Sequence, residues 1–511
     1  MKRLVSFVAL ALAAACSARA RSDDPSSQDD DVVASDDAFF GHDRVGAALT
    51  GHRERIPTTL AEVEALYGIG RACTRADSKE IFVVEETRSR TPAGEVTGEG
   101  AMIPRAVVSG CNTGDLADPE SVARSTSLFA ALVSDPSRAA DTSGDGILRE
   151  PVEVMARDDR TGIYNFYVFA KDERGNPEVT RILRDGATGA VLERRLPSRG
   201  RASPAMPPAN DSKRCFACHV NGGPLMNEMR DPWTNWISFK KSLPVSRLDG
   251  DTKALVSEAT PNVATGRSSL ANDLEPIMRS AIRAHVSGSA SHGGGWAART
   301  LAEPNGLATL LGSLFCETEL NYGSATDALP IESFIDPDLN SGDLVSPDAF
   351  GDTPLLMPVR SEFDRAVERW LTDQGYVSHE VATAIRLFDD ENDVFSDTRC
   401  TLKDEAVVAI GAARGASEVA ERLRALLLTR AGLAPFASAQ PKRHGYLTAL
   451  LQPSPAADAV DAAFADYRSE LSSRFDAMKA DTSRPETRAQ ERKARAKAMF
   501  AGRSTPLPLL R

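Results

Sequence analysis

Short runs of β-branched and aromatic residues, separated by polar and glycine-containing stretches, mark the chain between about residue 56 and residue 196. Such runs, when turn residues bound them, are typical of β-strands. The polar stretch Asp172–Asn176 suits a hairpin loop, and Val179–Leu183 can return as the next strand. We therefore predict a β-rich N-terminal half, with further strands in Ile81–Val84, Ala106–Val108, Val152–Ala156 and Ile163–Phe169.

After about residue 246 the apolar residues recur at every third or fourth position, which predicts amphipathic α-helices. Ser361 with Asp364 can start one helix, Ser454 before Pro455 can start another, and Gly432 can end a third. We predict an α+β fold, with a β-rich N-terminal half, a segment around residue 215, and a mainly α-helical C-terminal half. The predicted core stripes are Phe363, Val367, Trp370 and Leu371; Val419, Leu423, Leu426 and Leu427; and Val460, Phe464, Tyr467, Leu471, Phe475 and Met478.

At 511 residues the chain is long enough for two or three domains. We predict a signal peptide in residues 1–20, an acidic disordered tether in 21–55, a β-rich domain in 56–245 and a mainly α-helical domain in 246–511. The tether should not fold alone, because it is rich in aspartate and poor in large apolar residues. A net charge of −12 argues against a nucleic-acid partner and permits a basic protein partner.

The first residues of the chain predict export. An apolar run from Leu4 to Ala15 follows two basic residues, which is typical of a signal peptide, and the run is too short to span a membrane. The run ends in small residues before Cys16, similar to a bacterial lipobox in which Cys16 would be lipidated. Cleavage after Ala20 at an A-x-A site is the alternative. We expect a location in the periplasm or at the outer membrane, with membrane contact only through the N-terminal lipid anchor.

The sequence Cys215-Phe216-Ala217-Cys218-His219 is the most informative motif of the chain. Two cysteines separated by two residues and followed by histidine form the attachment sequence of a c-type haem. The chemistry requires this spacing, because each thiol adds to one porphyrin vinyl group and the adjacent imidazole binds the iron. We therefore expect one covalently attached haem c in the β-rich domain, bound by Cys215 and Cys218, with His219 as an iron ligand.

Three other structures can contain two cysteines at this spacing. A zinc knuckle needs two further ligands at short spacing, and no second CxxC or HxxxH follows. A thioredoxin-like redox pair lies between a strand and a helix, whereas the flanks of this motif are polar and rich in proline. A disulfide across two residues is strained. Haem attachment is the interpretation that the motif favours.

The remaining cysteines predict two disulfide bonds. Without Cys16 and the haem pair, an even number of cysteines is left in a protein that we expect to be exported. Sequence proximity favours Cys73–Cys111 and Cys316–Cys400, which puts one bond in each half of the chain. Pairing across the halves and buried free thiols are the alternatives.

The surroundings of the motif carry a resemblance to a known group of proteins. Upstream stands Tyr164-Asn165-Phe166-Tyr167, and downstream stand Gly222-Gly223-Pro224-Leu225-Met226-Asn227-Glu228 and Pro232-Trp233-Thr234-Asn235-Trp236. An aromatic strand, CxxCH, GGxxMxE and PWxxW in this order resemble exported bacterial single-haem c-type cytochrome domain proteins. The resemblance implies haem attachment at Cys215 and Cys218 and proximal ligation by His219. A weaker likeness to cytochrome P460 depends on the aromatic segment before CxxCH, and this chain departs from it because there the motif lies near the C-terminus.

The second axial ligand of the iron has three candidate solutions. Met226 is the first, with Met229 similar to it; Met226 follows His219 by seven residues, which reach around a haem edge only when nearly extended. His285 lies on a predicted helix, on one face with Met278 and Ile282, where a histidine is more often a core residue than a ligand. An open or water-bound iron is the third solution. We predict His219 and Met226 as the metal ligands.

These residues predict an electron-transfer protein more than an enzyme. No Ser-His-Asp grouping, phosphate-binding loop or HExxH helix is present in the sequence, so we expect no catalytic residues apart from the haem site. We predict an exported mono-haem cytochrome c that relays single electrons in the cell envelope to a redox partner protein. The alternative is a haem enzyme or a gas or redox sensor with an open iron coordination site. A third interpretation makes the helical half a scaffold for a partner.

Lipidation of Cys16 predicts the chemistry of the native N-terminus. Mass spectrometry should find an acylated cysteine followed by Ser17, because lipobox processing leaves the lipidated cysteine as the first residue. Cys16→Ser should remove the acyl group. A native product that begins at Arg21 would show that the A-x-A site is used and that the protein is free in the periplasm.

Overall fold

The structure is a computed structural model, and it divides into two compact units. The first unit comprises Met1–Met229 and Thr234–Gly295, and the second comprises Arg230–Trp233 and Trp296–Arg511. The elements given below are formed by the residues that the structure describes. These are residues 41–50, 52, 55–57, 62, 66, 80–87, 102–109, 117–126, 128–133, 152–158, 160–172, 174–184, 190–198, 215, 219, 222–224, 269–288, 294–315, 362–389, 396–411, 413 and 415–480.

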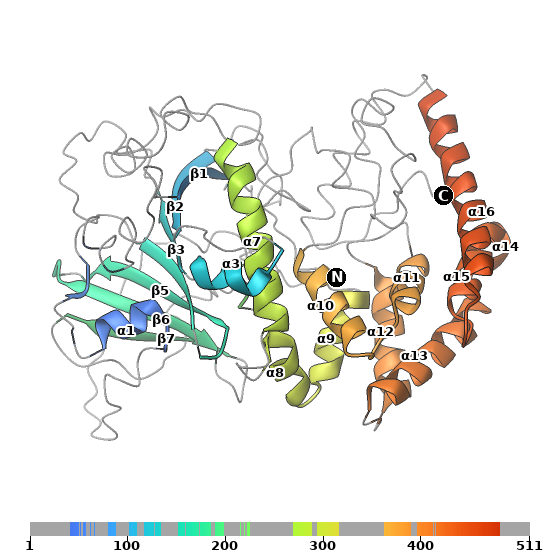
Figure 1. The fold of residues 1–511 in the computed structure, drawn as a ribbon, viewed down its shortest axis with the longest axis horizontal. Coiled ribbons are helices and arrows are strands. Elements are labelled where there is room, and N and C mark those ends of the chain that lie inside the picture. The colour runs from blue at the N-terminus through green and yellow to red at the C-terminus, as the bar shows by residue number, and fades with distance from the viewer. Residues whose placement is uncertain are drawn as a thin grey trace, which may run out of the picture. The chain divides into compact units, whose positions relative to one another are not determined.

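A seven-stranded antiparallel sheet forms the first unit, with its strands in the order in which they occur along the chain (Figure 1). The sheet and the helical C-terminal half confirm the predicted α+β fold. All five predicted strand regions are strands, whereas β3 and β7 were not predicted. The strands are β1 (Glu80–Thr87), β2 (Met102–Ser109), β3 (Leu128–Val133), β4 (Val152–Arg157), β5 (Tyr164–Lys171), β6 (Pro177–Arg184) and β7 (Val191–Pro197).

The predicted hairpin loop joins β5 to β6. The Asp172 side chain accepts hydrogen bonds from the backbone N–H groups of Arg174 and Asn176, at 2.9 and 2.7 Å. Gly175 has a φ of 78°, a left-handed conformation that glycine adopts without a steric penalty. The local turn chemistry therefore fixes the register in which β6 returns beside β5.

β5 is buried on both of its faces. Tyr164 and Phe166 lie on one face, and Asn165, Tyr167 and Phe169 alternate with them on the other. All five side chains are buried. Cover on both faces explains why this stretch is apolar and aromatic almost throughout, instead of alternating with polar residues.

The segment before the sheet covers the Asn165 and Tyr167 face. Asp43 caps the short helix α1 (Arg44–Leu49) by accepting from the backbone N–H of Gly46 at 2.9 Å. The other carboxylate oxygen accepts from the Tyr167 hydroxyl at 2.6 Å and from Asn165 Nδ2 at 2.7 Å. Burial raises the pKa of Asp43, and these three hydrogen bonds act against the rise.

The predicted tether of residues 21–55 overlaps the described residues 41–50. Residues 41–50 belong to the folded unit, because Asp43 is almost fully buried and makes an isolated antiparallel bridge to Asp158. The backbone N–H of His42 also donates to Asp158 Oδ2 at 2.9 Å. Polar contacts with the sheet therefore hold residues 41–43 in the first unit.

Two further helices belong to the first unit, α3 (Pro119–Ser125) and α7 (Ser269–Ser287), and they pack against each other. α7 contains the helix predicted around Met278, Ile282 and His285, and all three side chains are buried. α7 also lies against β1. The first helix after the predicted boundary at residue 245 therefore packs with the sheet, and the two units divide later, at Gly295.

The described part of the second unit is helical, and the predicted stripes are buried in part. Tyr467 of the third stripe is buried, whereas Leu426, Val460 and Phe464 are half-buried. Phe363, Val367, Trp370 and Leu371 are buried, as are Val419, Leu423 and Leu427. Among the described residues, no helix is both long and apolar enough to cross a lipid bilayer. The helices are α8 (Trp296–Ala302), α9 (Gly306–Phe315), α10 (Glu362–Asp373), α11 (His379–Leu387), α12 (Asp397–Ile410), α13 (Ala416–Ala431), α14 (Phe436–Ala439), α15 (Pro441–Leu450) and α16 (Ala457–Ala480).

A buried arginine joins α12 to α9 beside a predicted disulfide. Arg399 Nε donates to the carbonyl oxygen of Phe315 at 2.7 Å, and Arg399 is 1% exposed. Cys400 is a disulfide-bonded cysteine, and its partner lies outside the described residues. Phe315 and Arg399 directly precede Cys316 and Cys400 along the chain, but Cys316 lies outside the described residues, so the predicted Cys316–Cys400 pairing stays a prediction. Cys73 and Cys111 lie outside the described residues.

The turn between β4 and β5 is organised by the Asp158 carboxylate. Its Oδ1 accepts from the backbone N–H groups of Arg160 and Thr161, both at 2.9 Å, in addition to the bond from His42. Desolvation would raise the pKa of Asp158, but the backbone donors outweigh it and lower the pKa below its usual value of 3.8. The charged form therefore stabilises the folded state.

We expect Asp158→Asn to lower the free energy of unfolding by about 1–2 kcal/mol at pH 7, because charge-assisted hydrogen bonds are lost. A carboxyl group with a depressed pKa contributes stability above its unfolded pKa and loses that contribution as the pH falls through its folded pKa. The difference between wild type and Asp158→Asn should therefore shrink below pH 3.8. Urea unfolding at pH 7 and pH 3 measures it, with Asp461→Asn at an exposed position of α16 as the control. An equal difference at both pH values would contradict the assignment.

Candidate functional site

The structure describes part of the predicted haem motif. Cys215, His219 and the following Gly222, Gly223 and Pro224 are described, whereas Cys218 and Met226 lie outside the described residues. The backbone N–H of His219 donates to the carbonyl oxygen of Cys215 at 2.8 Å, which is the spacing of one α-helical turn. Residues four apart in such a turn lie on the same side of it. The turn therefore presents Cys215 and His219 together.

Cys215 is half-buried and is not disulfide-bonded. After His219 the chain reverses, since the backbone N–H of Gly222 donates to the His219 carbonyl oxygen at 2.8 Å. Gly222 has a φ of 68°, which an L-residue with a Cβ adopts only with strain. A tight turn therefore follows the motif, and it brings the backbone of Gly223 back to the histidine ring.

The turn after the motif determines which ring nitrogen of His219 carries the proton. Its Nδ1 lies 3.0 Å from the carbonyl oxygen of Gly223. A carbonyl oxygen only accepts hydrogen bonds, so Nδ1 carries the proton and donates. In the neutral imidazole this leaves the lone pair on Nε2. Histidines that bind metals through one nitrogen commonly donate the other N–H to a backbone carbonyl, which fixes the ring orientation.

The imidazole of His219 packs on the sheet. Its ring centroid lies 4.9 Å from that of Phe166 on β5, at an interplanar angle of 36°. Phe166 belongs to the aromatic segment that precedes the motif in the sequence. The structure thus brings together a strand and a motif that are far apart along the chain, and His219 has apolar surface on one side.

A second histidine contacts the same strand face. His285, near the C-terminal end of α7, is 1% exposed, and its ring centroid lies 6.0 Å from that of Tyr164. Tyr164 and Phe166 are two residues apart on one face of β5, which places their Cα atoms about 7 Å apart. His219 and His285 therefore contact neighbouring side chains of one strand.

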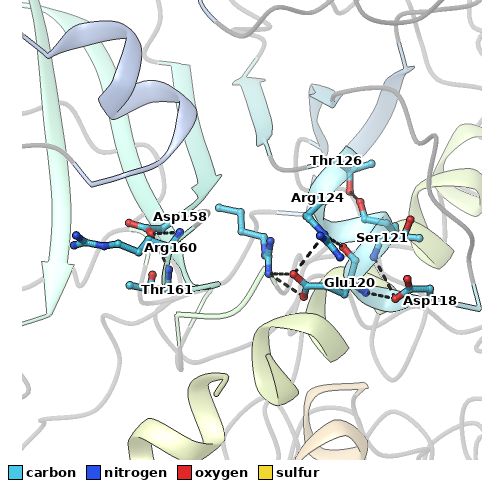
Figure 2. Close-up of polar contacts among 10 residues, drawn as sticks. Asp118, Glu120, Ser121, Arg124, Thr126, Asp158, Arg160 and Thr161 are labelled. Carbon is cyan, nitrogen blue, oxygen red and sulfur yellow. Dashed lines mark hydrogen bonds and ion pairs between the residues drawn. The ribbon is translucent and has the colours of Figure 1, made fainter. Parts of the chain in front are cut away.

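Sequence analysis missed a buried ion pair beside Tyr164. Arg157 is the partner of Tyr164 in the β4–β5 register, and its side chain is 0% exposed. Arg157 Nη2 donates to both carboxylate oxygens of Glu120 on α3, at 2.7 and 2.9 Å. Figure 2 shows Glu120 with Arg124 beside it on the same helix, and Asp118 capping the helix start. A lone arginine at the end of an apolar run gives no sequence signal of burial.

Three polar atoms of this cluster have no hydrogen-bond partner among the described residues. They are Nε and Nη1 of Arg157 and the hydroxyl oxygen of Tyr164. Burial raises the pKa of Tyr164 above its usual value, so its hydroxyl is protonated at neutral pH and can donate. The cluster therefore presents hydrogen-bond donors to the interior.

Within the described residues, no group of three or more His, Cys, Asp or Glu side chains converges to hold a metal ion. A haem iron takes four ligands from the porphyrin and one or two from the protein, so a haem site does not require such a group. The residues described around His219 fit this requirement, because they offer one oriented imidazole, a thiol one helical turn before it, and interior hydrogen-bond donors.

Comparisons with protein-family models, with curated proteins and with solved structures find no match to this chain. The resemblance to exported single-haem c-type cytochrome proteins therefore stays a prediction, and so does the weaker one to cytochrome P460.

Proposed function

We propose that this protein is an exported mono-haem cytochrome c that relays single electrons in the cell envelope. Cys215 and Cys218 would form the thioether bonds, and His219 would bind the iron through Nε2. The observation that carries the proposal is the hydrogen bond from His219 Nδ1 to the carbonyl oxygen of Gly223, which sets the tautomer that iron ligation needs. A haem held here supplies an iron that cycles between the ferrous and ferric states.

The surrounding residues would adjust the reduction potential in two opposing ways. The hydrogen bond to Gly223 makes the imidazole more basic, which favours ferric iron and lowers the potential. The buried ring of Phe166 beside His219 lowers the local polarity, which favours the less charged ferrous site and raises the potential. These contacts also hold the imidazole in one orientation, so little rearrangement would accompany electron transfer.

Location and partners follow from the sequence. The export signal and a lipid anchor at Cys16 would place the protein in the periplasm or at the outer membrane, where c-type haem is attached. With a net charge of −12, the surface would attract a redox partner that carries a basic patch. The acidic segment after Cys16 would separate the folded units from the membrane surface.

One observation favours the alternative function, a haem enzyme or a gas or redox sensor with an open iron site. His285, Tyr164 and Arg157 are buried polar side chains on or against one strand face, next to the contact between Phe166 and His219. Side chains of these types can hydrogen-bond a small molecule on an iron. Carbon monoxide binding by the reduced protein distinguishes the two functions, because an open iron binds it rapidly and a six-coordinate iron does not.

Covalent haem is the first test of the proposal. Thioether bonds survive denaturation, so the wild-type polypeptide should retain haem stain and the added mass of one haem after denaturing electrophoresis. The double variant Cys215→Ser, Cys218→Ser should lose both. The double variant Cys73→Ser, Cys111→Ser removes two cysteines outside the motif and should keep the stain. Haem that persists through denaturation in the motif variant would contradict the attachment site.

The predicted Met226 ligand gives the second test. Methionine sulfur stabilises ferrous iron, so Met226→Ala should lower the reduction potential, abolish the sulfur-to-iron absorption band at the red end of the ferric spectrum and open the iron to carbon monoxide. Met278→Ala and His285→Ala on α7 should leave the spectrum unchanged. An unchanged spectrum in Met226→Ala would exclude this ligand. Rapid carbon monoxide binding by wild type would support the enzyme or sensor function instead.

A further inference from the structure

Nε and Nη1 of Arg157 and the hydroxyl of Tyr164 have no hydrogen-bond acceptor among the described residues. A buried polar atom without a partner costs about 1–3 kcal/mol, and native proteins contain few such atoms. Here three of them lie together, because Arg157 and Tyr164 face each other across the β4–β5 ladder. Glu120 satisfies Nη2 of Arg157 and leaves Nε and Nη1. The cluster could therefore donate hydrogen bonds to the acceptor atoms of a bound group.

The charges around the cluster favour an anionic acceptor. Arg157 is always protonated, and Tyr164 is a donor at neutral pH because its burial raises its pKa. Among the described residues, Glu120 from α3 contacts Arg157 and His285 from α7 contacts Tyr164. Glu120 accepts only from Nη2, and the remaining atoms are donors, so a cation would find no acceptor there, whereas a carboxylate would gain charge-assisted hydrogen bonds. Guanidinium and hydroxyl donors together are well suited to carboxylate oxygens.

The cluster also lies close to the candidate iron ligand. Tyr164 is two residues from Phe166 on the same face of β5, about 7 Å along the strand. The ring of Phe166 in turn contacts the ring of His219. The two propionate groups of a haem leave one edge of the porphyrin and extend several ångströms beyond the iron. A carboxylate from a haem bound by His219 is therefore within reach of these donors.

We propose that Arg157 and Tyr164 form a carboxylate-binding subsite for one propionate of the haem. The inference rests on the proposed haem attachment. Arg157 Nε or Nη1 and the Tyr164 hydroxyl donate to the propionate oxygens, and the ion pair with Glu120 holds the guanidinium in place. Arg157 keeps the propionate ionised in the interior, and its positive charge favours reduction of the iron.

The test uses the haem-containing full chain and compares two tyrosines of one strand. Tyr164→Phe removes a hydroxyl that has no partner among the described residues, whereas Tyr167→Phe removes one that donates to Asp43 on the opposite face. Resonance Raman spectra report hydrogen bonding to the propionates through their bending mode. We expect this mode to shift to lower frequency in Tyr164→Phe and to stay unchanged in Tyr167→Phe. Arg157→Met should shift it further, lower the reduction potential and introduce a pH dependence of the potential near neutrality.

The outcomes separate this inference from the function on which it rests. Absence of covalent haem from wild type would overturn the proposed function itself. Covalent haem with an unchanged propionate mode in both Tyr164→Phe and Arg157→Met would overturn only the subsite. Acetate or nitrate that shifts the wild-type spectrum in a saturable way, but not that of Tyr164→Phe, would assign the donors to a diffusible anion and likewise overturn the propionate subsite.

Discussion

Burial of β5 from both sides is the constraint on which the first unit depends. A strand without a solvent-facing side leaves its polar side chains no water to bind, so each needs a partner inside the molecule. On one face the partner is Asp43, which the N-terminal segment delivers to Asn165 and Tyr167. On the other face the polar atoms belong to Tyr164 and to the neighbouring Arg157. The segments that cover β5 must therefore supply hydrogen-bonding groups as well as apolar surface.

The two faces differ in how completely their polar groups are satisfied. Around Asp43 the carboxylate accepts three hydrogen bonds, and Arg181 Nη2 donates to Asn165 Oδ1 at 2.8 Å, which extends the network to β6. A satisfied buried network makes a fold specific and rigid. Around Arg157 the ion pair with Glu120 is complete, and three polar atoms have no partner in the described part of the chain. The Asp43 face therefore stabilises the fold, whereas the Arg157 face has donors that could bind a ligand.

Sequence reasoning worked where local pattern and tertiary context agree. β5 was predicted because a strand covered on both faces must be apolar and aromatic, and the buried face of α7 was predicted because Met278, Ile282 and His285 repeat with the helical period. β7 was missed because Val191–Pro197 is interrupted by charged residues and is a strand only through its pairing with β6.

The polar core was beyond the reach of the sequence for a different reason. The burial of Arg157 depends on Glu120, which is distant along the chain and lies on a helix without an apolar stripe. The burial of Asp43 likewise depends on Tyr167, far along the chain. The motif itself predicted the chemical groups of the site, whereas the hydrogen bond that orients His219 depends on a turn whose closure is visible only in three dimensions.

The bridge between Asp43 and Asp158 has a mechanical consequence if the N-terminus is anchored in a membrane. Tension along the acidic segment would enter the folded unit at residues 41–43, where the backbone bridge and the hydrogen bond from His42 to Asp158 resist it. Asp158 directly follows Arg157 and begins the turn that leads into β5. A force on such an anchor would reach β5, the strand that contacts the imidazole of His219, through one short turn. If His219 binds the proposed haem, lateral drag at the membrane would change the surroundings of the iron.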